Sequence, residues 1–450
     1  MSFTNNHVGS RAFISEAAER QSMNPHEAIP VTVLGGSLGA GKTTLLNHLL
    51  TNAGDRDIAV LVNDMGAVNV DAELVASESD LSVGNGVTEL SNGCICCELQ
   101  DDLETAVVRL ARERSFDHLV VEASGVSEPG PVARLFVTSR AAARYEVAGL
   151  VTVVDVRLFA DTFVGGDPER TVAEESDGGV RPLSDLLVEQ VESADIVVLN
   201  KRDLVADAEL GAVREVVEAL RPDVEIAETA YGNVATKRLL ASLHDPDAPV
   251  GWRTVLDGNE GDSRVSDGDD GHGDGDDSHR HGHGHNTSHA EATYGITSFV
   301  YRRRAPLDPD GAAAVLGSLP DSVVRAKGSL WLAGTESVHY TYSQAGPSAT
   351  VTAAGPWIAT RPSFEQDAYR RNHPELDWHD TYGDRRTELV FIGRDIDEAG
   401  LAEALDEQLL EPGASVADTR YPTEAGKERR LAEPGRKERL TAMGGGAGDE

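Results

Sequence analysis

Residues 31–50 read VTVLGGSLGAGKTTLLNHLL, and this stretch determines the fold that we expect. It begins with the apolar and β-branched run from Val31 to Leu34 and ends with leucines at helical spacing. Between them, Gly36 to Thr43 match the pattern G-x-x-x-x-G-K-T in full. Glycines in this pattern let backbone N–H groups surround a phosphate at the start of a helix, while Lys42 reaches the terminal phosphates and Thr43 binds Mg²⁺. The stretch therefore predicts a phosphate-binding loop between a strand and a helix.

Downstream of this loop, short apolar runs alternate with helical stretches, as in a parallel sheet covered by helices. We expect strands at residues 31–34, 58–62, 119–121, 150–154 and 196–199. The predicted fold class is α/β, a P-loop doubly wound and mostly parallel sheet. From residue 294 strand-like runs at 322–326, 329–333, 338–342 and 388–392, with helices near 311–316 and 397–410, predict a smaller α+β C-terminal domain.

The tetrapeptide Asn200-Lys201-Arg202-Asp203 follows the apolar run at 196–199, at a strand's carboxyl end where α/β sheets bind ligands. A carboxylate at Asp203 can accept hydrogen bonds from guanine N1 and its amino group, which adenine cannot offer. On its own the motif could be a helix-capping turn. Together with the phosphate-binding loop it predicts GTP rather than ATP, with Asn200, Lys201 and Asp203 at the nucleotide.

Glu122 ends the run at 119–121 and is followed by Ala123, Ser124 and Gly125. A carboxylate there can hold Mg²⁺ through water, and the Gly125 N–H can contact the γ-phosphate. The alternative is a solvated acid at a strand end. Lys42, Thr43, Glu122 and Gly125 are therefore the candidate catalytic residues. Because no catalytic Gln or Arg finger is recognisable in the sequence, we expect slow intrinsic hydrolysis.

All three cysteines of the chain fall within four positions, at Cys94, Cys96 and Cys97. This odd, clustered set is a poor disulfide framework but matches a thiolate metal site in a reducing compartment. Three thiolates suit Zn²⁺ or Cu⁺ and leave one coordination position open for exchange, provided that the loop bends. Buried structural cysteines are the alternative.

The composition, 40 Lys and Arg against 76 Asp and Glu, gives a formal net charge of −36. Such a surface repels phosphate backbones and anionic lipids, so we expect no nucleic-acid or membrane partner. An acidic, lysine-poor surface is typical of a halophilic protein in a salt-rich cytoplasm. No membrane span and no signal-peptide core is recognisable, and we expect a cytoplasmic protein.

In this order the motifs resemble those of the CobW-type P-loop GTPases, a family that includes zinc chaperones and proteins for cobalamin and nitrile hydratase assembly. The resemblance runs from about residue 30 to 410 and covers the following motifs: GGSLGAGKTT (35–44), NDMG (63–66), ELSNGCICC (89–97), EASGVSEP (122–129), NKRD (200–203), RAKGSLWLA (325–333) and GDRRTELVFIG (383–393). The family usually has Asn-Glu-Phe-Gly where this chain has NDMG, so a metal contact does not transfer directly to Asp64.

The resemblance implies that Gly39, Ala40, Gly41, Lys42, Thr43 and Thr44 bind phosphate and Mg²⁺, that Asn200 and Asp203 bind guanine, and that Cys94, Cys96 and Cys97 bind metal. It names no fourth metal ligand. Arg325 and Lys327 are expected on a solvated strand face or in contact with a partner.

Between residues 257 and 289 the chain is rich in Gly, Asp, Ser and His. Its histidines, including His281, His283 and His285, can collect metal weakly; an acidic linker with incidental histidines is the alternative. The expected organisation is a polar extension (1–28), a GTPase domain (29–250), this linker (251–292), a CobW-like C-terminal domain (293–411) and a disordered tail (412–450).

The sequence thus predicts an Mg²⁺-dependent GTPase whose hydrolysis gates delivery of a metal to a client metalloprotein. Zn²⁺ is the expected metal, with Co²⁺ or Ni²⁺ as alternatives. Two other functions fit the same residues: a cobalt or cobalamin assembly GTPase, and a metal buffer or sensor in which GTP is only a structural ligand. The sequence leaves the client and a homodimer open.

Overall fold

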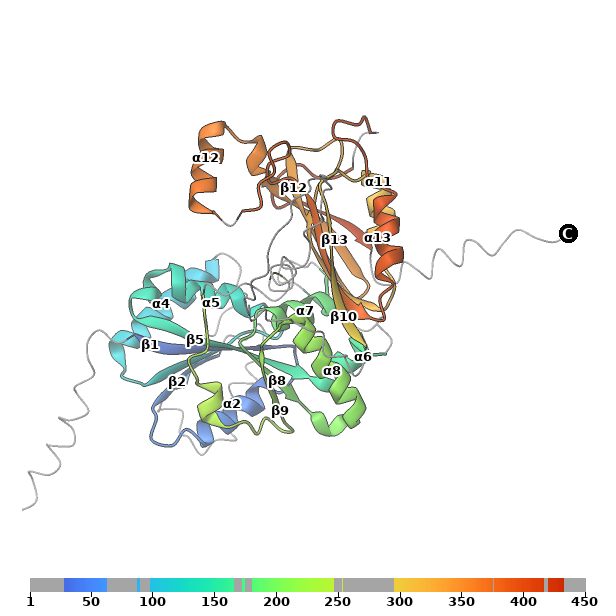
Figure 1. Cartoon of the computed structure of the whole chain (residues 1–450). Helices are drawn as coiled ribbons and strands as arrows, with labels where there is room; N and C mark the ends of the chain where they lie inside the picture. The colour runs from blue at the N-terminus through green and yellow to red at the C-terminus, as the bar shows by residue number, and fades with distance from the viewer. Residues whose placement is uncertain are drawn as a thin grey trace, which may run out of the picture.

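The computed structural model describes residues 28–62, 87–89, 98–165, 172–174, 180–246, 253, 295–374, 376–416 and 420–432. Structural statements below refer to these residues. They form two units, a parallel sheet flanked by helices and an antiparallel sheet that stands on it (Figure 1).

The first unit contains a sheet of seven strands in the order β3-β2-β4-β1-β5-β8-β9, with every neighbouring pair parallel. Its strands are β1 (Ile29–Gly36), β2 (Ile58–Val62), β3 (Val87–Glu89), β4 (His118–Glu122), β5 (Tyr145–Asp155), β8 (Ile196–Asn200) and β9 (Glu225–Glu228). The central strands are buried on both faces, which is why their sequences are almost uninterrupted apolar runs. The five strands predicted here and the α/β fold class are confirmed, whereas β3 and β9 were not predicted.

Helices cover both faces of this sheet. One face carries α2 (Lys42–Thr51) and α9 (Thr236–Leu239), packed on residues of β1, β2, β5 and β8. The other face carries α4 (Glu98–Glu113), α5 (Pro129–Thr138), α6 (Val156–Phe163), α7 (Leu183–Glu192) and α8 (Asp207–Leu220). Two 3-10 turns, η1 (Arg140–Ala143) and η2 (Arg202–Leu204), and a small antiparallel pair, β6 (Val172–Glu174) with β7 (Val180–Pro182), complete the unit.

The second unit is an antiparallel sheet of six strands in the order β10-β14-β11-β12-β13-β15. Its elements are β10 (Ile296–Arg303), α11 (Pro309–Leu316), β11 (Val323–Leu330), β12 (Val338–Ala345), β13 (Ser348–Pro356), η4 (Ile358–Thr360), α12 (Ser363–Asn372), β14 (Thr387–Arg394), α13 (Glu398–Asp406) and β15 (Glu428–Ala432). The helices α11 and α13 predicted here and the α+β class are confirmed.

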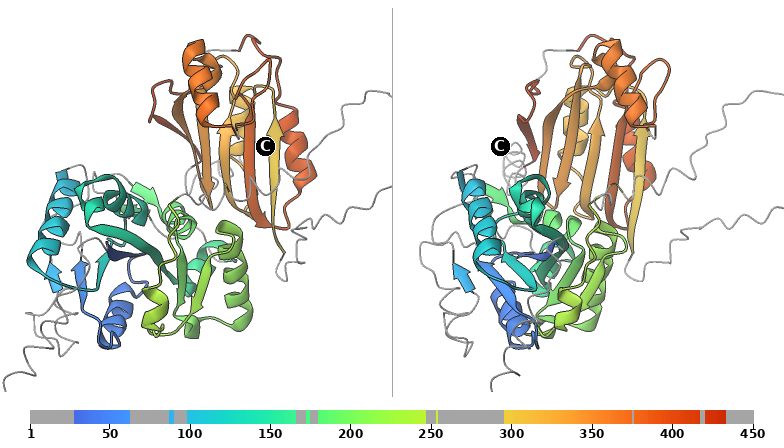
Figure 2. Two further views of the ribbon diagram at one scale, coloured as in Figure 1. Left: turned by 60° about the vertical axis from the view of Figure 1, so that its left-hand side comes forward. Right: turned by 90° about the vertical axis from the view of Figure 1, so that its left-hand side faces the viewer.

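The antiparallel sheet is covered on both sides, as alternation along β14 shows. Leu389 and Phe391 pack with residues of α11 and α13, while Val390 and Ile392 pack with residues of α7 and α8 from the first unit. Figure 2 shows the sheet rising from these helices. The two units therefore share one continuous hydrophobic core rather than meeting at a wet surface.

Two predictions about the second unit are wrong. The runs predicted at 322–326 and 329–333 are replaced by one strand, β11 (Val323–Leu330), which continues through Gly328 and ends before residues 331–333. Gly328 has a φ of 154°, and a Cβ there would stand 2.0 Å from the carbonyl oxygen of Glu388. The tail was expected to be disordered from residue 412, yet β15 pairs with β13. Tyr421 is buried there and donates a hydrogen bond to the carbonyl of Pro309 at 3.1 Å.

Several predictions lie outside the described residues: the N-terminal extension, NDMG at 63–66, the three cysteines, and the histidines of the linker. Within the described part of the chain, no helix is both long and apolar enough to cross a membrane.

Candidate nucleotide site

The loop that follows β1 has the geometry of a phosphate cradle. Lys42 is 8% exposed, and its ammonium group donates to the carbonyls of Gly36 at 2.9 Å and Ser37 at 3.2 Å. The ammonium is thereby held across the loop at the first turn of α2, where backbone N–H groups and the helix dipole favour an anion. Among the described residues the buried Ser37 hydroxyl has no hydrogen-bond partner, so it can form a hydrogen bond with a bound ligand.

The glycines of the loop are required by close approaches. A Cβ at Gly36 would stand 2.3 Å from the carbonyl oxygen of Val153, and one at Gly41 would stand 2.4 Å from Nδ2 of Asn200. Both residues also have positive φ, as does Gly39 at 75°. Ala40 is fully buried, Thr43 is half-buried at the start of α2, and Thr44 is exposed. The loop thus fits a phosphate chain laid against its backbone.

Glu122 and Gly125 lie beside this loop. Glu122 is 4% exposed at the end of β4, and its Cα is paired with that of Leu34 in β1. Gly125 touches the loop itself, since a Cβ there would stand 2.8 Å from the Leu38 nitrogen. The strand end and the turn after it therefore face the phosphate cradle, where a buried carboxylate suits a hydrated Mg²⁺ held together with the Thr43 hydroxyl.

Asn200 connects two loops of the site, a role that its sequence position did not reveal. Its side-chain Nδ2 donates to the carbonyl of Ala40 at 2.9 Å, and its Oδ1 accepts from the Gly232 N–H at 3.1 Å. Gly232 in turn lies against α2, because a Cβ there would stand 2.9 Å from the Leu45 nitrogen. The loop after β9 is thereby fixed beside the phosphate cradle. This loop follows strand β9, which was not predicted from the sequence; recognising β9 would have placed the loop at the same edge of the sheet as the nucleotide site.

Lys201 and Asp203 follow at the end of β8. Lys201 has a φ of 62°, and its ammonium pairs with Asp155 at 2.7 Å. Asp155 also accepts the Arg157 and Leu158 N–H groups, so it caps α6. Asp203 lies in η2, two residues after Lys201, and is exposed at the surface. Lys201 is thus held by a neighbour, while the Asp203 carboxylate is accessible to a ligand.

The metal site predicted at Cys94, Cys96 and Cys97 falls outside the described residues, as do His281, His283 and His285. Among the residues that the structure describes, no group of three His, Cys, Asp or Glu side chains is arranged to hold a metal ion. The elements that flank the cysteines are described: β3 ends at Glu89 and α4 begins at Glu98.

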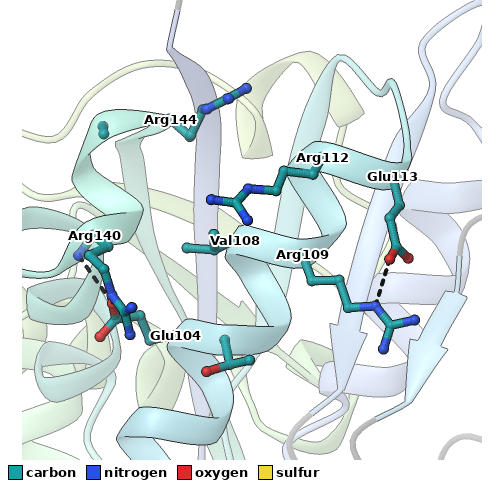
Figure 3. A pocket seen from close by; sticks show the side chains of 9 residues that line it. Glu104, Val108, Arg109, Arg112, Glu113, Arg140 and Arg144 are labelled. Atoms are coloured by element: carbon teal, nitrogen blue, oxygen red, sulfur yellow. Dashed lines mark hydrogen bonds and ion pairs between the residues drawn. The ribbon is translucent and has the colours of Figure 1, made fainter.

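A groove of about 500 Å³ lies over α4 and η1, lined by Arg109, Arg112, Arg140 and Arg144 among others (Figure 3). It sits where α4 ends and just before β5 begins, at the amino edge of the sheet, away from the phosphate cradle. Glu113 pairs with Arg109 at 2.8 Å, and Glu104 pairs with Arg140 at 2.5 Å. The groove is therefore a solvated, partly neutralised surface separate from the nucleotide site.

A parallel sheet with a phosphate-binding loop after β1 and an NKxD tetrapeptide after β8 defines a P-loop GTPase. A family model described as the CobW/HypB/UreG nucleotide-binding domain matches residues 30–228. The cobalamin synthesis protein CobW C-terminal domain matches residues 296–409. The chain belongs to the CobW family of GTPases.

Among its relatives is the zinc-regulated GTPase metalloprotein activator 1 of Dictyostelium discoideum, 30% identical over 416 residues that cover 84% of this chain and 79% of that protein. The zinc chaperone CobW of a Sinorhizobium species is 35% identical over 219 residues, covering 47% of this chain and 62% of the relative. The crystal structure of the Zn(II)-bound YjiA GTPase from E. coli has 22% identity and a TM-score of 0.36, covering 85% of this chain and 99% of that one.

Proposed function

We propose that this protein is a GTP-hydrolysing metallochaperone that holds Zn²⁺ at Cys94, Cys96 and Cys97 and passes it to a client metalloprotein. The metal is cargo, and the nucleotide state sets how firmly it is held. The names of the Dictyostelium and Sinorhizobium relatives, a zinc-regulated GTPase activator and a zinc chaperone, support zinc as the metal.

One observation carries the proposal: four strand ends lie in a row at the same edge of the sheet. Glu89 of β3 is paired with Val62 of β2, Val62 with Glu122 of β4, and Glu122 with Leu34 of β1. At the usual strand spacing, the row places Glu89 about 14 Å from the start of the phosphate-binding loop. The cysteine segment, residues 90–97, is attached to this edge at Glu89, which supports coupling between the nucleotide and the metal.

The chemistry at the cradle follows from the residues in place. When GTP binds, the Lys42 ammonium can exchange the two loop carbonyls for phosphate oxygens at little cost, because it already points across the loop. Mg²⁺ would be held by Thr43 and, through water, by Glu122, and would neutralise charge on the phosphates. The Gly125 N–H would contact the γ-phosphate, and hydrolysis would release the turn that carries Gly125.

Guanine selectivity would come from Asp203. Its carboxylate can accept two hydrogen bonds from guanine, and adenine would leave these acceptors unpaired. Asn200 would act indirectly, by holding the loop at Ala40 and the loop at Gly232 in one arrangement. We expect cytoplasmic location and slow Mg²⁺-dependent turnover.

Zinc affinity measured in two nucleotide states tests the proposal. A chromophoric zinc chelator competes with the full-length protein loaded with GDP or with a non-hydrolysable GTP analogue. We expect about one tightly bound Zn²⁺ whose affinity differs between the states, and loss of this ion when the three cysteines are replaced by Ser.

Phosphate release with and without Zn²⁺ separates the alternatives. Zinc bound equally tightly in both states would refute the gating. No phosphate release under any condition would favour a metal buffer with GTP as a structural ligand. Preference for Co²⁺ over Zn²⁺ in the same competition would favour an assembly GTPase.

A further inference from the structure

Helix α7 (Leu183–Glu192) lies between the two sheets and is buried along almost its whole length. Leu186, Val188 and Val191 share one core cluster with residues of β5 and β8 on one side and of β11 and β14 on the other. A helix enclosed in this way cannot shift without moving both units, because packed cores tolerate few voids.

The last turn of α7 contacts the turn after β4. Gln190 is 1% exposed, and its Nε2 donates to the carbonyl of Ser127 at 3.0 Å. Ser127 is tied to Ser124 through both its N–H, at 3.1 Å, and its hydroxyl, at 3.0 Å. Gly125 lies within this closed turn and touches Leu38 of the phosphate-binding loop. Gln190 is therefore in direct contact with the segment expected to respond to the γ-phosphate.

The same turn of α7 contacts the second unit through an ion pair. Glu192 is held by Arg325 of β11 in a bidentate pair, with Nε to Oε1 at 2.8 Å and an N–H₂ nitrogen to Oε2 at 3.0 Å. The side chains are 6% and 1% exposed. Arg325 also donates to the Ser343 hydroxyl at 3.0 Å and the Gln344 carbonyl at 3.1 Å. The expectation that Arg325 lies on a solvated face is wrong, because its charge is compensated inside the protein.

Lys327 extends this contact toward the turn. Its ammonium lies 3.8 Å from Glu192, and burial, with Arg325 beside it, lowers the pKa of Lys327 to about 8. The carboxylates of Glu192 and Glu128 act in the opposite direction. Glu128 is the residue before α5 and the last residue of the turn that holds Gly125. The second unit therefore contacts α7 through Arg325 and Lys327, and the charge of Glu128 acts on Lys327 from the end of the turn.

We propose that Gln190 and Glu192 form a relay that couples the nucleotide-sensing turn at 124–128 to strand β11 of the C-terminal domain. Two residues apart on an α-helix, they point in nearly opposite directions, one to each partner. A shift of Gly125 toward the γ-phosphate moves the Ser127 carbonyl, and the embedded helix transmits the movement to Arg325. The inference rests on the proposed GTPase function and adds regulation: Gln190 and Glu192 are positioning residues.

Coupling of this kind is reciprocal, so nucleotide state moves the C-terminal domain, and changes at the domain contact alter the nucleotide site. The chain carries a convenient reporter, because none of its four tryptophans lies between residues 29 and 250. In a Trp252→Phe background, the remaining donors Trp331, Trp357 and Trp378 all belong to the second unit. Energy transfer from them to a mant-labelled nucleotide reports the distance between the units.

The experiment compares transfer to mant-GDP with transfer to a mant-labelled non-hydrolysable GTP analogue in the full-length Trp252→Phe protein. We expect the two efficiencies to differ, and Gln190→Met to reduce the difference by more than half while slowing GTP hydrolysis about two- to tenfold, the effect of one lost hydrogen bond. Lys327→Met tests the contact between Glu192 and the second unit. Lys327 is partly exposed, so this substitution endangers folding less than one at the buried Arg325, and it should also reduce the difference in transfer efficiency.

Ser193→Ala is the matched control, because within the part of the chain that the structure describes the Ser193 hydroxyl bonds only to α7's own carbonyls, Glu189 at 2.9 Å and Gln190 at 3.3 Å. It should keep the full difference. Equal efficiencies in the Trp252→Phe protein, or a difference unchanged by both Gln190→Met and Lys327→Met, would overturn the relay while leaving nucleotide binding and hydrolysis intact. Absence of nucleotide binding in the parent protein would overturn the proposed function as well.

Discussion

Asn200→Ala tests whether the nucleotide site depends on the two hydrogen bonds by which Asn200 joins the loops at Ala40 and Gly232, here called the Asn200 bracket. The Asn200 side chain is 2% exposed and makes two hydrogen bonds, to the Ala40 carbonyl at 2.9 Å and from the Gly232 N–H at 3.1 Å. Truncation leaves a buried acceptor and a buried donor without their partner. At about 1–3 kcal/mol for each unsatisfied group, with water entering the space to soften the loss, we expect the free energy of unfolding to fall by about 2–4 kcal/mol.

Part of this loss should also weaken nucleotide binding, because loops that are no longer held must be ordered by the ligand. If ordering the two loops on binding costs about half of this loss in the free energy of unfolding, the nucleotide affinity falls about 5- to 30-fold. GDP and GTP should be affected alike, since both would lie in the phosphate-binding loop that Asn200 holds at Ala40, and they differ only at the γ-phosphate, which is expected at Gly125. Titration with mant-GDP and urea unfolding measure the two effects.

The control is Asn52→Ala at the exposed end of α2. Among the residues that the structure describes, this side chain bonds only locally, to the His48 carbonyl at 2.8 Å and the His48 ring at 3.4 Å. Its effect on nucleotide affinity should be negligible. If Asn200→Ala bound mant-GDP as tightly as the wild type and kept its urea midpoint, the bracket would not stabilise the site, and our account of Asn200 would be wrong.

Three further predictions concern the nucleotide-sensing turn at 124–128 and two buried ionisable groups, His118 and Lys327. Gly125→Ala should slow hydrolysis about tenfold or more, because its Cβ would stand 2.8 Å from the Leu38 nitrogen; Gly130→Ala, whose Cβ meets nothing within 4 Å, is the phosphate-release control. Burial lowers the pKa of His118 from 6.5 to about 4. Between pH 6.5 and pH 4 His118 binds a proton in the unfolded chain but stays neutral in the folded protein. The free energy of unfolding should therefore fall by about 2 kcal/mol from pH 7 to pH 5. Urea titrations at the two pH values should show a smaller fall for His118→Gln. For Lys327, whose pKa burial lowers from 10.5 to about 8, the unfolded chain holds the extra proton between these values, so stability should rise with pH there and Lys327→Met should flatten the rise.

The nucleotide cradle could be predicted from sequence because its chemistry is local. The glycines, Lys42 and Thr43 lie within the eight consecutive residues from Gly36 to Thr43, and the pattern is flanked by a strand and a helix that can be recognised in the sequence. The strands β1, β2, β4, β5 and β8 were predictable for a related reason, since strands buried on both faces must be continuous apolar runs. Short strands lack that signal, which is why β3 and β9 were missed.

The relay through Gln190 and Glu192 and the Asn200 bracket could not be predicted from the sequence, because each joins residues far apart in the chain. Arg325 and Glu192 are separated by 133 positions, and Asn200 and Ala40 by 160. A buried arginine looks like a surface arginine in sequence, and only the packing of β11 on α7 makes it internal. Likewise, β15 reads as a charged tail because Glu428 and Arg430 are exposed and Arg429 is half-buried, so its place in the sheet rests on backbone pairing with β13 rather than on buried apolar side chains.

The pairing of β15 with β13 affects how the C-terminal domain should be handled in the laboratory. The CobW C-terminal family model ends at residue 409, before this strand begins at Glu428. A fragment cut at that boundary would expose the backbone donors and acceptors of β13 and remove the anchor at Tyr421. An unprotected sheet edge of this kind invites pairing with another molecule, so such a fragment should aggregate even though every family motif is present.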